Sequence, residues 1–171
     1  MGELEGWTSC PRCRGELAGT SARLRCASCG FVVYANPKPT ATAVCVDPSG
    51  RVLLTRRAVP PRIGAWDLPG GFVDEDEHPL DTIRRELHEE TGYEVEPVSF
   101  LGVWMDEYGG DSTARSTLNL FWVARVLSGE PRAADDVSEL RWFQPDELPP
   151  GEELAFACVG LALAAWRNED A

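Results

Sequence analysis

The sequence predicts an α+β fold in which a mixed β-sheet packs against two main helices in α/β/α layers. Three observations lead to this prediction. β-rich runs recur between residues 40 and 143, two stretches (79–90 and 152–168) have the composition of helices, and four cysteines stand in pairs near the N-terminus. The chain has 171 residues, which is the length of one compact domain with a small addition.

The four N-terminal cysteines form two Cys-x2-Cys pairs. Cys10 and Cys13 are separated from Cys26 and Cys29 by twelve residues, and two such pairs can place four thiolates tetrahedrally around one zinc ion. The segment therefore resembles a zinc ribbon, which we expect to span residues 1–35. Because four cysteines leave no open coordination position, we favour a structural zinc that stabilises the fold of this short segment. A docking module for nucleic acid or protein is the alternative.

The main domain is expected to span residues 36–171. It begins at an Asn-Pro-Lys-Pro sequence (36–39), a stiff and extended joint. A turn signal (47–50) predicts a β-hairpin, and a Leu-Pro-Gly-Gly sequence predicts a loop at 67–71. The remaining expected elements are strands at 40–46, 51–55, 100–104, 117–126 and 140–143, a helical turn at 145–148, and a final helix, apolar on most sides, at 152–168.

The helix expected at 79–90 starts with Pro79 and stops before Gly92, which are typical first and terminating residues. Its apolar residues fall on one core-facing stripe. Glu86, Glu89 and Glu90 occupy a neighbouring arc of about 100°. An acidic run of this kind is usually a solvated face, but a hard cation such as Mg²⁺ also makes it tolerable, because Mg²⁺ prefers oxygen ligands.

The residues around this helix follow a longer pattern. From Gly71 to Gly92 the spacing is G-x5-E-x7-R-E-U-x-E-E-x-G, in which U is an aliphatic residue. This pattern resembles the box of the Nudix hydrolases, although Tyr93 stands where the family has an aliphatic residue. The resemblance extends over residues 40–150 and implies a Nudix-like α/β/α sandwich.

The resemblance implies roles for individual residues of the box. Glu86, Glu89 and Glu90 would ligate Mg²⁺, for which Mn²⁺ can substitute, while Glu77 and Arg85 would orient that cluster. Two glycines before the helix would let the backbone approach the metal and the phosphate groups closely; they are Gly70 and Gly71.

Other site residues are less tightly constrained by the pattern. The general base would be Glu86, Glu89 or an acid from a later loop, and Asp136 is the preferred later acid; a solvated acidic turn is the alternative there. Trp66 could stack on a base and Arg115 could bind a phosphate. For both, a packing or surface role is the alternative.

Net charge excludes some partners. The chain carries 16 basic and 28 acidic residues, a net charge of −12. Because the first 34 residues carry four arginines against three glutamates, the remainder carries −13. Such a surface disfavours nucleic acid, and a phosphate ligand would need a bridging divalent cation.

No segment predicts contact with a membrane. The uncharged run at 154–166 is too short to cross a bilayer, and the N-terminus lacks the basic and apolar regions of a secretory signal. We therefore expect a cytoplasmic protein.

These observations predict a Mg²⁺-dependent pyrophosphohydrolase that cleaves a nucleoside diphosphate linked to another group, with ADP-ribose-like compounds favoured. The proline-rich sequence of the NADH pyrophosphatases does not follow the box. The alternative is a non-catalytic sensor that binds such a metabolite and docks through its ribbon. The resemblance also allows a homodimer.

Overall fold

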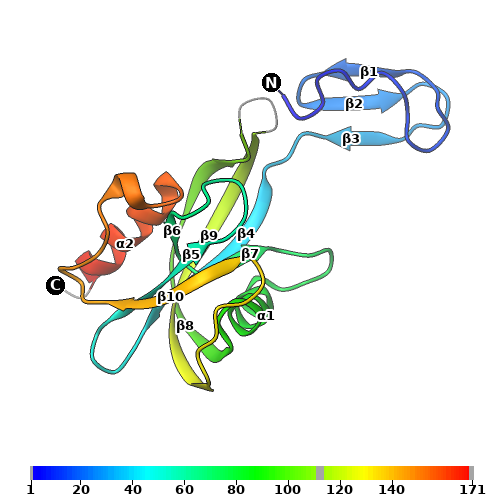
Figure 1. The fold of residues 1–171 in the computed structure, drawn as a ribbon. Helices are drawn as coiled ribbons and strands as arrows, with labels where there is room; N and C mark the ends of the chain where they lie inside the picture. Colours follow the sequence, from blue (N-terminus) through cyan, green and yellow to red (C-terminus); the bar gives the residue numbers. More distant parts are fainter. Residues whose placement is uncertain (1, 111–113, 170–171) are drawn as a thin grey trace.

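The computed structural model describes residues 2–110 and 114–169. Figure 1 shows a small sheet near the N-terminus, followed by a larger sheet with one helix on each side. The small sheet is antiparallel, and its strands in order are β1 (Leu17–Thr20), β2 (Arg23–Cys26) and β3 (Val32–Tyr34). Its core includes Leu17 and Leu24 packed beside two of the four paired cysteines.

The larger sheet is mixed, as predicted. Its main path runs β10-β5-β4-β9-β8, with β6 beside β5 and β7 beside β4. The pairing of β4 with β9 is parallel, and the other pairings within this sheet are antiparallel. The strands are β4 (Lys38–Val46), β5 (Val52–Arg57), β6 (Trp66–Asp67), β7 (Gly70–Phe72), β8 (Tyr93–Tyr108), β9 (Arg115–Gly129) and β10 (Val137–Phe143).

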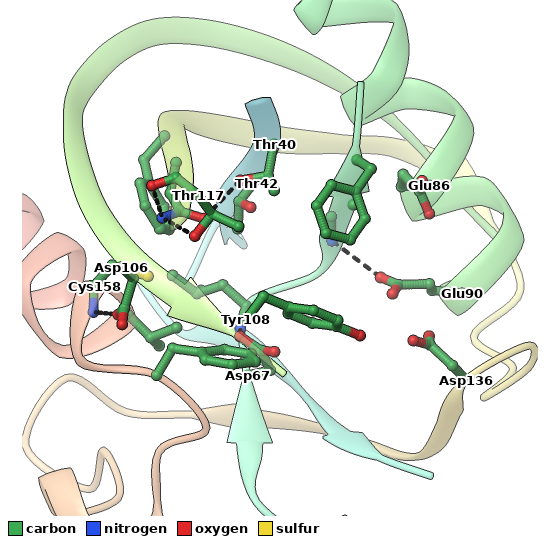
Figure 2. A pocket seen from close by; sticks show the side chains of 18 of the residues that line it. Thr40, Thr42, Asp67, Glu86, Glu90, Asp106, Tyr108, Thr117, Asp136 and Cys158 are labelled. Atoms are coloured by element: carbon green, nitrogen blue, oxygen red, sulfur yellow. Dashed lines mark hydrogen bonds between the residues drawn. The ribbon is translucent and has the colours of Figure 1, made fainter. Parts of the chain in front are cut away.

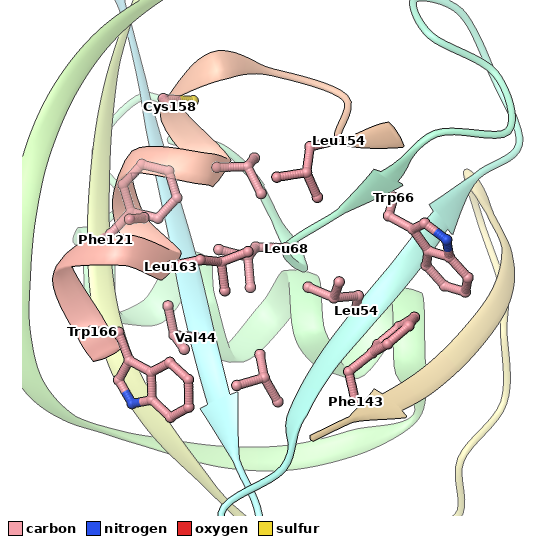
Figure 3. Packing of buried hydrophobic residues seen from close by; sticks show 13 residues of the cluster. Val44, Leu54, Trp66, Leu68, Phe121, Phe143, Leu154, Cys158, Leu163 and Trp166 are labelled. Carbon is pink, nitrogen blue, oxygen red and sulfur yellow. The ribbon is translucent and has the colours of Figure 1, made fainter. Parts of the chain in front are cut away.

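Alternation along β4 divides the core between the two helices. Ala43 and Cys45 face α1 (Pro79–Thr91), whereas Val44 lies in the cluster packed with α2 (Ala157–Glu169). Figure 3 shows this second cluster, in which α2 and the sheet enclose large apolar side chains. The sheet is therefore buried on both faces, which agrees with the predicted α+β layers.

Helix α1 has the predicted ends. Pro79 is its first residue, and the side chain of His78 accepts a hydrogen bond from the Leu80 N–H at 3.2 Å. Gly92 takes a left-handed conformation (φ 73°) and donates its N–H to the His88 carbonyl. These caps define both ends of the helix and hold the box carboxylates within it.

Other elements differ from the predictions. The loop predicted at 67–71 contains the ends of two short strands, and the strands β8 and β9 are longer than expected. The final helix starts at Ala157 rather than 152, after a short 3₁₀ turn (Gly151–Glu153). Leu154 is extended because it bridges to Trp66, whose carbonyl accepts the Ala155 N–H at 2.8 Å. Within the predicted helical turn at 145–148 the chain makes a single turn, in which the Glu147 N–H donates to the Gln144 carbonyl at 2.9 Å.

Across the described ranges, no helix combines the length and the apolar character that crossing a membrane requires.

Candidate active site

A cavity of about 280 Å³ lies where β4, β7, β8 and β9 meet the two helices. Figure 2 shows its lining: Glu86, Glu90 and Asp136 lie at one end, Asp106 and Cys158 at the other, and the Tyr108 ring between them. The cavity therefore connects the predicted carboxylate cluster to a second, polar end formed by the sheet and α2.

Glu90 is the most buried of the predicted metal ligands, with 6% of its surface exposed. Its Oε2 accepts a hydrogen bond from the Gly70 N–H at 3.0 Å, so β7 and α1 are tied together at the cavity. Burial raises the pKa of Glu90 well above its ordinary value, and the nearby charges of Asp136 and Glu86 act in the same direction. A cation at this end of the cavity would favour the ionised form.

The two predicted glycines lie where an added Cβ would displace its neighbours. A Cβ on Gly71 would overlap the Glu86 carboxylate, and a Cβ on Gly70 would lie 2.5 Å from the Ala41 carbonyl oxygen. Gly70 also has a φ of 147°, a conformation that favours glycine. Gly70 therefore allows β7 to lie close to β4, and Gly71 leaves room for the Glu86 carboxylate in its present position.

Arg85 holds three carboxylates beside the cavity. Its Nε and Nη2 each donate to Glu77 at 2.8 Å, and its Nη1 donates to Glu86 at 2.7 Å and to Glu89 at 3.3 Å. Hydrogen bonds from Arg85 lower the pKa of Glu77 to about 2. Burial raises the pKa of Glu86 although Arg85 opposes this effect. Arg85 thus places carboxylates and offsets part of their mutual repulsion.

The three box glutamates do not occupy equivalent positions. Glu86 and Glu90 line the cavity, whereas the Glu89 side chain is 48% exposed and lies outside the cavity lining. Among the described residues, the carboxylate oxygens of Glu86, Glu89 and Glu90 do not all lie within 4.8 Å of one another, as the four cysteine sulfurs do. Carboxylate oxygens remain the donor set that fits Mg²⁺.

Asp136 lies at the same end of the cavity. Its carbonyl accepts a hydrogen bond from the Ala58 N–H at 2.6 Å, and the preceding Asp135 has a φ of 54°. The Asp136 side chain faces Glu90 and raises the pKa of that carboxyl. The loop before β10 therefore brings this acid to the cavity lining.

Two further predicted residues lie outside the cavity lining. Trp66 is 3% exposed, and its ring packs edge to face against Phe143 with 5.0 Å between the ring centres. This position agrees with a packing role, which was the alternative to stacking on a base. The Arg115 side chain is 61% exposed and lies 3.6 Å from Glu3, in agreement with the surface alternative.

The middle of the cavity contains residues that the sequence reasoning missed. Arg57 and Asp67 form an ion pair of 3.1 Å in its wall, and Arg57 also donates to the Tyr108 hydroxyl at 3.1 Å. Burial raises the pKa of Asp67 to about 6, although Arg57 opposes this effect. The available signal was a charged residue beside apolar ones at two places: Arg57 at the end of residues 52–57, and Asp67 between Trp66 and Leu68.

The polar end of the cavity holds a buried network. Thr40 donates its hydroxyl to the Asn119 side-chain oxygen at 2.8 Å, and the Asn119 amide donates to the Thr117 hydroxyl at 3.0 Å. At the start of α2, Asp106 accepts the Cys158 N–H at 2.8 Å. These groups make this end of the cavity polar.

The four N-terminal cysteines converge as predicted. The Sγ atoms of Cys10 and Cys29 are 3.6 Å apart, those of Cys13 and Cys26 are 3.5 Å apart, and all four lie within 4.8 Å of one another. Tetrahedral zinc with Zn–S bonds near 2.3 Å requires sulfur separations of about 3.8 Å. This cluster therefore fits a zinc ribbon.

Comparison with known proteins defines the class. Residues 36–157 match the NUDIX domain family. Because this match covers well over half of the chain, and the box and the fold agree with it, the chain belongs to the Nudix family. Its class is that of the Nudix-type pyrophosphatases.

Individual relatives differ in their names. A MutT-like protein from Streptomyces ambofaciens is 34% identical over 61% of this chain and 62% of its own length. The ADP-ribose pyrophosphatase of Methanocaldococcus jannaschii is 31% identical over 74% of this chain and 71% of its own length. The crystal structure of a NUDIX hydrolase from Nitrosomonas europaea superposes with a TM-score of 0.76 at 27% identity, covering 95% of this chain and 91% of that one. The chain thus spans about three fifths of the Streptomyces relative.

Proposed function

We propose that the protein is a Mg²⁺-dependent pyrophosphohydrolase acting on a nucleoside diphosphate linked to a second group. The observation that supports this most directly is the buried Glu90, held by the Gly70 N–H at a cavity that Glu86 and Asp136 also line. Carboxylates placed together at a cavity suit a hard cation that bridges protein and phosphate oxygens. Mn²⁺ should substitute for Mg²⁺.

We assign roles to the box residues on this basis. Glu86, Glu89 and Glu90 would hold the cation, and the exposed position of Glu89 suits a ligand at the outer edge of the site. Glu77 acts through Arg85, which it fixes with two hydrogen bonds. When bound, the cation would lower the pKa of water and neutralise charge on the phosphate oxygens.

In the chemical step, a water oxygen forms a bond to phosphorus while the bridging P–O bond breaks. Asp136 is the preferred group to accept the proton of that water, since it lies at the cavity beside Glu90. The leaving phosphate oxygen takes the electron pair of the broken bond. The products are a nucleoside monophosphate and the phosphate of the second group.

ADP-ribose and similar compounds are the proposed substrates. Support comes from the Methanocaldococcus relative, which is named an ADP-ribose pyrophosphatase, and from the polar end of the cavity, which offers hydroxyl and amide groups to an uncharged moiety. Other relatives are named putative 8-oxo-dGTP diphosphatases and NAD-capped RNA hydrolases. The acidic surface favours small molecules over nucleic acid.

The test is release of a nucleoside monophosphate from ADP-ribose, NADH, a dinucleoside polyphosphate, coenzyme A and a nucleoside triphosphate, each with and without Mg²⁺. We expect one preferred substrate and no turnover without the cation. Tight binding to one compound without turnover would contradict the proposal and would instead support a metabolite sensor.

We further propose two units, a ribbon at 1–35 and a catalytic domain at 36–171. The change of sheet between β3 and β4 supports this division. The zinc would be structural, because the four thiols already surround the site. The free thiols of the four cysteines favour a reducing compartment such as the cytoplasm. A homodimer stays a prediction of the family resemblance.

A further inference from the structure

Arg57 connects parts of the cavity wall that are far apart in the sequence. Its side chain is only 10% exposed. Its Nε donates to the Pro61 carbonyl at 2.8 Å, its Nη1 to Asp67 at 3.1 Å and its Nη2 to the Tyr108 hydroxyl at 3.1 Å. The guanidinium also lies over the ring of Phe156, 5.4 Å from its centroid. One side chain therefore holds a loop, two strands and the segment before α2.

The contact with Asp67 leads towards the carboxylate end. Asp67 Oδ1 accepts the Leu68 N–H at 2.9 Å, and the Pro69 carbonyl accepts the Ala43 N–H at 3.0 Å. The next residue, Gly70, donates its N–H to Glu90. The path from Asp67 to Gly70 is thus fixed at each step, so a shift of Asp67 would move the donor that holds Glu90.

The contact with Tyr108 leads towards the opposite wall. The Tyr108 ring packs edge to face on Phe72 at 5.3 Å and stacks on Phe156 at 5.6 Å. Figure 2 shows the Tyr108 ring between the two ends of the cavity, close to Asp67. The hydrogen bond to the Tyr108 hydroxyl fixes the position of this ring. It therefore sets the width of the passage between the carboxylate end of the cavity and its polar end.

Stability alone does not account for this ion pair. Removing two charges from water costs free energy that their attraction often fails to recover, and apolar replacements are frequently neutral. Burial raises the pKa of Asp67 to about 6, which is the sign of that cost. A costly pair at a reactive cavity points to a role in placing other groups.

We propose that Arg57 and Asp67 act together as a positioning pair that holds the Gly70 donor and the Tyr108 ring in the arrangement that turnover requires. The proposal rests on the proposed hydrolase function, since it concerns the same cavity. Neither residue takes or gives a proton in the chemical step. Their effect is carried through Gly70 and Tyr108.

The neighbouring residue supplies a matched control. Arg56 lies on the same strand, its Nε is 2.9 Å from Glu139 Oε2 although not aligned as a hydrogen bond, and its guanidinium lies 4.3 Å from the centre of the Trp66 ring. It lies outside the cavity lining. Arg56→Met and Glu139→Gln therefore remove an arginine–carboxylate pair of the same strand that is more exposed and lies away from the cavity.

The experiment measures kcat and KM at saturating Mg²⁺ for R57M, D67N, the double variant R57M/D67N, and the controls R56M and E139Q. Misplacement by about 1 Å can cost roughly 100-fold, so we expect kcat to fall roughly 10- to 100-fold in each cavity variant, with a smaller change in KM. The double variant should lose no more than the worse single variant. R57K should recover little, because lysine lacks the planar fork that reaches three partners.

Thermal unfolding and hydrogen exchange separate positioning from folding. We expect R57M to unfold at a lower temperature than R56M, because removing one partner of a buried pair leaves the other one unpaired. The Gly70 amide should exchange faster in R57M than this loss of global stability explains, with no such excess in R56M. Equal kcat in R57M and R56M, or losses that multiply in the double variant, would overturn the proposal. If R57M fails to fold, D67N and Y108F provide the same comparison.

The exchange measurement does not depend on turnover. A wild-type protein inactive on every substrate would refute the proposed function, whereas the Gly70 amide would still report on the pair. Unchanged Gly70 exchange in both R57M and D67N would refute the positioning proposal by itself.

Discussion

The two candidate metal sites of this chain are built on opposite principles. In the N-terminal cluster, four sulfur atoms lie within 4.8 Å of one another around one point. In the cavity, Glu86 and Glu90 are held separately, one by Arg85 and the other by the Gly70 N–H. The thiols surround their site completely, while the carboxylates face an open volume of about 280 Å³.

This difference indicates a structural role for the zinc ion and a catalytic role for the cation in the cavity. A closed four-thiol site excludes water and substrate, so its binding energy contributes to folding. An open carboxylate site leaves positions for water and phosphate oxygens, so its cation can take part in a reaction. The comparison predicts that damage to the first site affects the fold of the N-terminal sheet, and damage to the second affects turnover.

The largest effect is expected from Glu90→Gln. The change removes a ligand charge but keeps the volume and an oxygen that can accept the Gly70 N–H. Loss of several kcal/mol of metal-assisted stabilisation corresponds to a fall in kcat of roughly 1,000-fold or more. Initial rates at saturating Mg²⁺ check this, with circular dichroism as the control for folding. Near-normal rates would exclude Glu90 as a ligand.

Gly71→Ala should produce the next largest loss. Its new Cβ would overlap the Glu86 carboxylate, so this side chain must move. We expect a fall in kcat/KM of roughly 100-fold, as for other small misplacements at reactive sites. Gly151→Ala is a suitable control because a Cβ there meets nothing within 4 Å. Equal activity of the two variants would show that Glu86 does not need its present position.

Cys26→Ser should change activity little and folding locally. Cys26 is fully buried in the small N-terminal core, and loss of one thiolate weakens the tetrahedral site. We expect zinc content, measured by mass spectrometry, to fall from one ion per chain to well below one. The kcat should stay within about threefold of wild type, since the reactive carboxylates lie on α1. A loss as large as that of Glu90→Gln would contradict the division of roles.

The smallest effect concerns acid stability. Hydrogen bonds from Arg85 lower the pKa of Glu77 from 4.5 to about 2. A carboxyl with a lowered pKa stabilises the fold above its unfolded pKa, and this contribution is lost as the pH falls from about 4.5 towards 2. In Glu77→Gln the free energy of unfolding should fall less steeply over that range. Urea titrations at several pH values test this, and parallel curves for both proteins would refute it.

Local patterns predicted α1 and its carboxylates well. Pro79 and Gly92 act on neighbouring backbone groups, so the ends of the helix can be found without tertiary information. The spacing from Gly71 to Glu90 also lies within one loop and one helix, so the family pattern could be recognised from the sequence, whereas the contact of Gly71 with Glu86 is known only from the structure.

Contacts between distant segments could not be predicted in the same way. The Arg57–Asp67 pair depends on the register of β5 with β6, and its third partner, Tyr108, is 51 positions from Arg57. The start of α2 depends on a bridge from Leu154 to Trp66, which interrupts a sequence of good helix formers. Trp66 itself is buried in the core cluster and lies outside the cavity lining.

The most direct test of the account compares three proteins in one assay: wild type, Glu90→Gln and Cys26→Ser, each given ADP-ribose with Mg²⁺ or with a chelator. We expect turnover by wild type and Cys26→Ser only with Mg²⁺, and none by Glu90→Gln. Turnover by Glu90→Gln at the wild-type rate, or activity that follows zinc content rather than Mg²⁺, would contradict it.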